Sequence, residues 1–266
     1  MAGFFEVVSE DDEEIADYLR HINPRRLHVN NAISPEMMVL ITLKFYATGS
    51  FLITVGDFDG VYKSPTSKII KRVSRAIAQL RPRYIRMPET EEEIRKIRQG
   101  FYNIARSPRY IGAFDYTHVK IQSPGGDQAE IYRNRKQYFS INVQTICGPD
   151  LKILNIVARW EGSQHDSTIF NNSNVRGRFE RGEMGNNLFV GDSGYPIRKY
   201  LITPLANPVT PAEQLFNESQ IRTRNPVERC YGVWKRRFPI LSLGIRLNIE
   251  RVEAVIVACA ILQYCM

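Results

Sequence analysis

Apolar residues recur at three- and four-residue steps in the first third of the chain, and this spacing predicts helices. One such segment is Pro35–Thr48, which ends at Gly49. A second helix is predicted to run to about residue 79, with Ser64 as its N-cap and Pro65 as its first residue. A polar helix is also predicted over residues 10–20 and a charged one over 89–100.

Beyond residue 107 short apolar runs predict strands. Four come first, at residues 110–114, 118–122, 139–147 and 152–160, the last two joined by the turn Gly148-Pro149-Asp150. A helix at 166–181, strands at 188–190 and 200–203, a helical region from Pro211 with a break at Pro226, and an apolar helix from about Ile249 follow. We therefore predict an α/β fold with helices flanking a mixed sheet. The predicted boundary separates a small helical region, residues 1–106, from an α/β domain, residues 107–266.

Charge is distributed unevenly along the 266 residues. The first 20 residues carry seven acids and one base, whereas the remainder carries 35 bases against 21 acids. A body this basic attracts polyanions such as nucleic acid, although charge that only keeps a protein soluble gives the same pattern. The helix after Ser64 has a basic face, which suits either a helix-turn-helix unit on DNA or simple solvation; its bases are Lys68, Lys71, Arg72 and Arg75.

The same composition disfavours several classes of protein. The four cysteines include no C-x-x-C pair, which argues against a disulfide scaffold or a zinc ribbon. The acidic first residues do not resemble a signal peptide. The longest apolar run, residues 254–262, is far shorter than the roughly 20 residues of a membrane span, so we expect no membrane partner.

Three carboxylates occupy positions that suit either local structure or a site. Asp115 follows the apolar run 111–114, and Asp192 follows a buried strand at 188–190, at the edge where α/β sheets keep their sites. A turn hydrogen bond explains each equally well. Glu228 belongs either to a capping box that starts at Asn225 or to the edge of a buried helical stripe beside the sheet.

Together these acids suggest metal chemistry. Oxygen ligands suit hard divalent cations, and two such ions can activate water and stabilise the leaving oxygen of a phosphodiester. Asp166 either starts a helix as its N-cap or binds metal directly. The bases after Glu228 are candidate phosphate contacts, with a solvated helix face as the alternative; they are Arg229, Lys235, Arg236 and Arg237.

Four ordered motifs resemble the PIF/Harbinger transposase superfamily, most closely the domesticated Harbinger transposase-derived nucleases of animals. They are Ile111-Gly112-Ala113-Phe114-Asp115-Tyr116-Thr117-His118, Gly162-Ser163-Gln164-His165-Asp166-Ser167, Gly191-Asp192-Ser193-Gly194-Tyr195-Pro196 and Val227-Glu228-Arg229-Cys230-Tyr231. The resemblance implies an RNase H-like core with a DDE triad on Asp115, Asp192 and Glu228. It also implies Asp166 as a secondary acidic site and Mg²⁺ or Mn²⁺ as cofactor.

The same resemblance implies a metal-dependent DNA endonuclease that hydrolyses phosphodiester bonds. DNA and a separate Myb/SANT-like protein are the implied partners, and the implied location is the nucleus, with the cytoplasm as a second compartment; a homo-oligomer is left open. Tyr116 departs from the glycine usual in the family and narrows access beside the metal position, and the C-terminal segment lacks the family's His-Asn pair. The alternative is a catalytically silent nuclear protein that binds DNA or recruits partners through the basic helix at 65–79.

Overall fold

The computed structural model describes residues 33–57, 63–164, 166–171 and 173–265, without the side chains of residues 57, 63, 64, 166, 167 and 265. The predicted helix at 10–20 lies outside these residues. They form two compact units, neither of them continuous in sequence. Of the described residues, the first unit contains 33–57, 63–84, 120–124 and 234–265, and the second contains 85–119, 125–164, 166–171 and 173–233. The position between residues 106 and 107, where the sequence predicts a domain boundary, lies inside the second unit because residues 85–106 cluster with it; the two predicted domains themselves stay a prediction.

The first unit is helical. Its elements are α2 (Pro35–Thr48), α3 (Leu52–Asp57), α4 (Lys63–Gln79), α5 (Arg81–Tyr84), α10 (Ile240–Leu243), α11 (Ile249–Cys265) and the end of α9. Helix α11 carries buried apolar residues on most of its surface, and it packs against α4. A buried hydrogen bond of 2.6 Å joins the Tyr46 and Ser74 hydroxyls of α2 and α4. Among the described residues, no helix has the length and apolar character needed to cross a membrane.

Helix α4 begins earlier than predicted. Its first residue is Lys63, so Pro65 is the third helical residue and Ser64 lies inside the helix instead of capping it. Proline is tolerated there because the amides of a first turn have no helical acceptor. The predicted basic face is present opposite buried Ile70 and Val73, with three exposed bases and one half-buried; these are Lys68, Arg72, Arg75 and Lys71.

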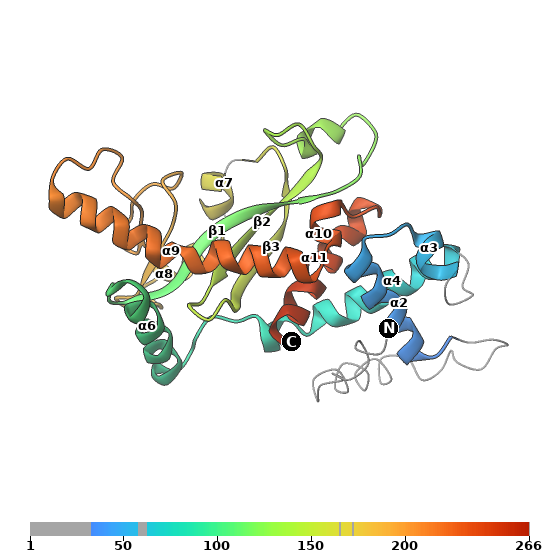
Figure 1. The fold of residues 1–266 in the computed structure, drawn as a ribbon, viewed down its shortest axis with the longest axis horizontal. Helices are drawn as coiled ribbons and strands as arrows, with labels where there is room; N and C mark the ends of the chain where they lie inside the picture. The colour runs from blue at the N-terminus through green and yellow to red at the C-terminus, as the bar shows by residue number, and fades with distance from the viewer. Residues whose placement is uncertain (1–32, 58–62, 165, 172, 266) are drawn as a thin grey trace. The chain divides into compact units, whose positions relative to one another are not determined.

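The second unit is built on a five-stranded sheet of order β3-β2-β1-β4-β5. Figure 1 labels β1, β2 and β3 of this sheet. Its strands are β1 (Tyr110–Lys120), β2 (Ser140–Cys147), β3 (Ile153–Glu161), β4 (Leu188–Val190) and β5 (Leu201–Ile202). β4 is parallel to both β1 and β5, whereas β2 and β3 form an antiparallel hairpin. This mixed sheet with flanking helices confirms the predicted α/β class and is consistent with an RNase H-like core.

Strand β1 is continuous, whereas two strands at 110–114 and 118–122 were predicted. It runs without interruption through Asp115 because Arg224, distant in sequence, provides a positive charge beside that carboxylate. Gly112 lets the neighbouring strands approach β1 closely. A Cβ at Gly112 would overlap the Ile146 side chain of β2 and lie 3.0 Å from the Phe189 ring of β4.

Helices of the second unit are α6 (Glu91–Ala105), α7 (Asp166–Asn171), α8 (Asn174–Glu180) and most of α9 (Pro211–Arg237), with a short 3-10 helix η2 (Ala129–Tyr132). The capping box of Thr90 and Glu93 starts α6 two residues after the predicted position. The predicted helix at 166–181 is in fact two helices, because the Ser173 hydroxyl accepts a hydrogen bond from the Arg176 amide and begins α8. Aromatic residues from β1, β4, α7 and α8 form the core of this unit, including Phe114, Phe189, Phe170 and Phe179.

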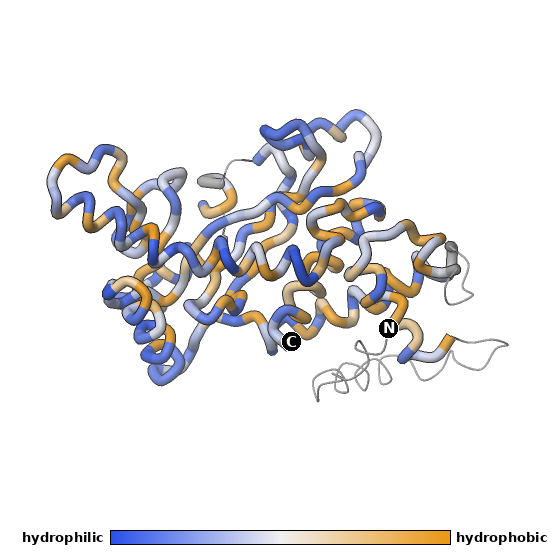
Figure 2. The backbone as a smooth tube through the Cα atoms, in the orientation of Figure 1, coloured by the Kyte–Doolittle hydropathy of each residue, from blue (hydrophilic) through white to orange (hydrophobic). Residues whose placement is uncertain are grey.

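Helix α9 continues through Pro226, which corrects the predicted break and capping box at Asn225-Pro226. The capping box lies at the true start instead, where Glu213 accepts from the Thr210 amide at 2.8 Å and its own amide donates to the Thr210 hydroxyl at 3.3 Å. Burial of the residues after Pro226 offsets the one hydrogen bond lost at the proline. Figure 2 shows hydrophobic residues alternating with hydrophilic ones along α9. Because α9 is continuous from Pro211 to Arg237, Glu228 lies inside the helix and is not a capping residue.

Candidate active site

The register of two parallel strands brings Asp115 and Asp192 to one level of the sheet. Ala113 of β1 pairs with Val190 of β4, and each aspartate lies two residues beyond its member of that pair. Asp192 is half-buried in the turn that follows β4, where its Oδ1 accepts a hydrogen bond of 3.0 Å from the Gly194 amide. The turn interpretation of Asp192 is therefore correct for Oδ1, and this bond leaves Oδ2 to face other groups.

Helix α9 joins Glu228 to this place through Arg224. The guanidinium donates from Nη1 to Asp115 Oδ2 at 3.1 Å and from Nη2 to Glu228 Oε1 at 2.5 Å. Arg224 and Glu228 lie one helical turn apart, a spacing at which opposite charges pair. A hydrogen bond of 2.7 Å from the Thr145 hydroxyl of β2 to Tyr231 OH holds the following turn of α9 against the sheet.

Asp115 lies in a strongly perturbed environment. Its side chain is 12% exposed, and burial is the main reason that its pKa rises to about 6. The hydrogen bond from the Tyr116 amide and the charge of Arg224 lower the pKa, whereas the charges of Asp192 and Glu228 raise it. Asp192 and Glu228 are thus each close enough to repel the charge of Asp115, and a carboxylate perturbed in this way is typical of functional sites.

The fit of these residues to a divalent cation depends on Arg224. In the part of the chain that the structure describes, no three His, Cys, Asp or Glu side chains form a group ready to hold a metal. The donor set nevertheless suits a hard cation, since all three side chains offer carboxylate oxygens and their charge exceeds that of Arg224. The guanidinium lies between Asp115 and Glu228, where a cation shared by these two acids would bind. A cation shared by Asp115 and Glu228 would have to take the place of the Arg224 guanidinium.

Other predicted site residues are less closely connected. Asp166 is the first residue of α7, and its side chain lies outside the described structure, so its role as cap or ligand stays a prediction. Tyr116 is half-buried beside Asp115 and packs edge-on against Tyr195, with ring centroids 6.2 Å apart. On α9, Arg229 and Arg236 are exposed and Lys235 is half-buried.

The bases of α4 belong to the other compact unit, and the structure does not join them to the three acids. The predicted DNA contacts on α4 and α9 therefore stay predictions. Arg224 is the site residue that the sequence pattern did not reveal. The only local signal for it is its position four residues before Glu228.

Comparisons with known proteins give one consistent family. The profile of the "DDE superfamily endonuclease" family matches residues 114–263. The chain is 32% identical over 237 residues to the human protein "Putative nuclease HARBI1", which covers 88% of this chain and 68% of the human one. It is 27% identical to the Xenopus laevis protein of that name over 253 residues, or 94% of this chain and 72% of the other. It is also 24% identical to the Arabidopsis thaliana "Protein ALP1-like" over 249 residues, or 88% and 61%. No solved structure matches the chain.

Proposed function

Since the chain belongs to the DDE superfamily endonuclease family, we propose that it hydrolyses phosphodiester bonds of DNA in a reaction that depends on divalent metal. Family membership confirms the predicted relation to Harbinger-derived nucleases. Asp115, Asp192 and Glu228 are the proposed catalytic acids. The basic body of the chain supports a polyanionic substrate.

One observation carries this proposal. Asp115 of β1 and Glu228 of α9 share a single guanidinium, and the charge of Asp192 at the end of β4 acts on the same Asp115 carboxylate. Asp115 is therefore repelled by two other carboxylates and paired with one guanidinium. A site with that imbalance favours additional cations, and carboxylates are the donors that Mg²⁺ and Mn²⁺ prefer.

Each residue has a separate role in the proposed reaction. Asp115, Asp192 and Glu228 would hold the divalent ions, which would supply activation of water and stabilisation of the leaving oxygen. Arg224 pairs with two of these carboxylates in the metal-free protein, and its planar guanidinium would be available to a phosphate oxygen of the substrate strand if the ions took its place. Tyr116 narrows the approach beside Asp115.

Nicking of supercoiled plasmid in the presence of Mn²⁺ tests this function. Because metal stabilisation of charge contributes several kcal/mol, Asp192→Asn should lower the nicking rate by about 10³-fold or more. DNA binding should persist, since a negative charge is lost. Asp127→Asn is the matched control, because Asp127 is an exposed acid outside the proposed site.

Two results would contradict the proposal. Asp192→Asn that nicks like the wild type would remove Asp192 from the mechanism. A wild-type protein that binds DNA but nicks no duplex, hairpin or single-stranded substrate would favour the catalytically silent DNA-binding protein instead.

A further inference from the structure

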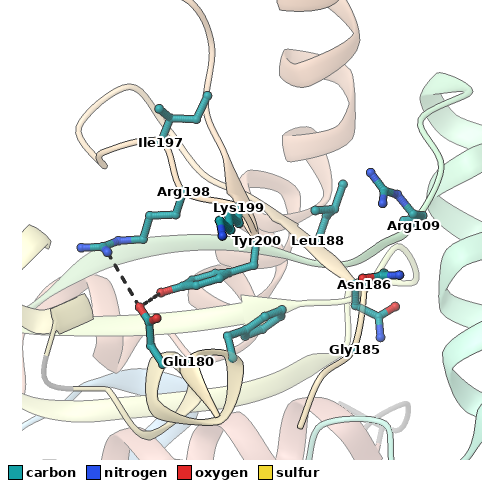
Figure 3. Close-up of a pocket in the computed structure, with 11 residues that line it drawn as sticks. Arg109, Glu180, Gly185, Asn186, Leu188, Ile197, Arg198, Lys199 and Tyr200 are labelled. Atoms are coloured by element: carbon teal, nitrogen blue, oxygen red, sulfur yellow. Dashed lines mark hydrogen bonds and ion pairs between the residues drawn. The ribbon is translucent and has the colours of Figure 1, made fainter. Parts of the chain in front are cut away.

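A second chemically distinct region is a pocket of about 760 Å³ at the start of β4 (Figure 3). Leu188, the first residue of β4, lines this pocket, whereas Asp192 follows the last residue of the same strand. The four residue steps from Leu188 to Asp192 span about 13 Å in extended chain. The pocket is thus separate from the three acids, and its volume is within the usual range for small-molecule ligands.

The pocket carries uncompensated positive charge. Its acid, Glu180, is already engaged: Oε1 accepts a hydrogen bond of 2.7 Å from Tyr200 OH and lies 3.8 Å from Arg198 Nη1 (Figure 3). The other two charged residues of the lining, Arg109 and Lys199, are exposed. Neither forms an ion pair with any residue in the described ranges. An anionic ligand would therefore meet two available cations.

The backbone fixes both cations beside β4. On one side the Leu188 amide donates to the Arg109 carbonyl at 2.9 Å, and on the other the Phe189 amide donates to the carbonyl of Tyr200, next to Lys199, at 2.7 Å. Arg109 also has a φ of 70°, in the left-handed region that residues other than glycine rarely adopt. Such strain persists where the surrounding structure imposes it, and it concentrates at ligand sites.

We propose that this pocket binds a backbone phosphate of a nucleic acid strand, with Arg109 and Lys199 as its contacts. The choice of ligand rests on the proposed function, because the substrate of a DNA endonuclease supplies that anion. The Phe179 and Tyr200 rings stack with centroids 4.7 Å apart and form an apolar wall suited to a sugar. At about 3.4 Å per base pair, the roughly 13 Å between Leu188 and Asp192 corresponds to about four steps of duplex, so the contacted phosphate lies away from the bond to be cut.

Fluorescence anisotropy with a labelled duplex of about 20 base pairs tests the pocket without divalent metal. We expect Arg109→Ala/Lys199→Ala to weaken binding about tenfold and to reduce the slope of log Kd against log salt by about 2, since each duplex phosphate contact contributes about 0.9. Arg95→Ala/Lys96→Ala removes the same charge from the exposed face of α6 and should do much less. Equal losses in the two double variants, or an unchanged slope in the first, would overturn the proposal.

Two further probes identify the anion. Inorganic phosphate and polyglutamate are titrated against wild type and the Arg109/Lys199 variant. If polyglutamate loses as much affinity as the duplex, or if inorganic phosphate binds as tightly as the duplex, the pocket is not a nucleic acid contact.

The same assay separates this proposal from the proposed function. The pocket is supported by a reduced salt slope whether or not the wild type nicks plasmid. The proposal is overturned if Arg109→Ala/Lys199→Ala binds the duplex as tightly as the wild type does, even if Asp192→Asn abolishes nicking. Matching circular dichroism and melting temperatures of the variants show that both are folded.

Discussion

Charged side chains of opposite sign lie near the two ends of strand β4. Beyond its last residue, Asp192 acts on Asp115, and two of the three acids there share Arg224. Near its first residue, Arg109 and Lys199 line a pocket in which the one acid, Glu180, already accepts a hydrogen bond from Tyr200 OH. One short strand and its two neighbours thus separate the proposed cation site from the proposed anion site.

Strand β1 contributes to both ends, with Arg109 just before its start and Asp115 within it. The register between β1 and β4 therefore aligns both regions at once. At the acidic end Arg224 pairs with two of the three acids, and in the pocket Glu180 lies beside Arg198 while Arg109 and Lys199 form no ion pair within the described residues.

The largest effect is expected at the acidic end. The folded-state pKa of Asp115, about 6, is above its ordinary value of 3.8. The stabilisation linked to protonated Asp115 is complete below about pH 3.8 and is lost as the pH rises through 6. At about 1.4 kcal/mol per unit, Asp115→Asn should raise the free energy of unfolding of the metal-free protein by up to about 3 kcal/mol at pH 7.5 and by almost nothing at pH 3.5.

Urea unfolding at the two pH values measures this difference, with Asp127→Asn as control. A gain that is the same at both pH values would show that the Asp115 charge is not the cause.

Gly112→Ala should disturb both ends together. The added Cβ overlaps Ile146 and crowds Phe189, and overpacking of this kind costs about 2 kcal/mol. We expect a lower melting temperature and weaker binding of both Mn²⁺ and duplex. A destabilised variant with unchanged affinity for both ligands would show that the register of β1 and β4 does not couple the two regions.

Arg224→Gln should strengthen Mn²⁺ binding at the acidic end, whereas Gly112→Ala should weaken it, and the effect of Arg224→Gln should be smaller. Removing the competing guanidinium should tighten Mn²⁺ binding about tenfold by calorimetry, or about 1.4 kcal/mol. Arg198→Gln, at the opposite end of β4, should leave Mn²⁺ affinity unchanged. Weaker Mn²⁺ binding by Arg224→Gln would mean that Arg224 organises the acids instead of competing for them.

Local sequence signals were sufficient to predict the elements whose ends carry a capping residue or a glycine. Helix α2 has a capping serine and a terminal glycine, and its bounds agree with the prediction. The short strand β4 and the β2–β3 hairpin were also predicted, because apolar runs bounded by glycine have few alternatives. The positions of Asp115 and Asp192 after apolar runs therefore followed from sequence.

Features that depend on distant partners were not predictable. A break was expected at Asp115 because its neighbours in sequence offer no counter-charge, but Arg224 lies 109 positions away. A break was expected at Pro226 because proline removes a hydrogen bond, but tertiary packing of the following turn keeps α9 continuous. The pocket combines Arg109, Glu180 and Lys199 from three separate segments, so no spacing in the sequence indicates it.

The proposed metal site is tested by calorimetric titration of Mn²⁺ at neutral pH into the wild type and into Asp115→Asn/Asp192→Asn. We expect the wild type to bind Mn²⁺ and the double variant to lose this binding while both proteins remain folded. Equal Mn²⁺ binding by the two proteins, or none by the wild type, would contradict the assignment of a metal site to these acids.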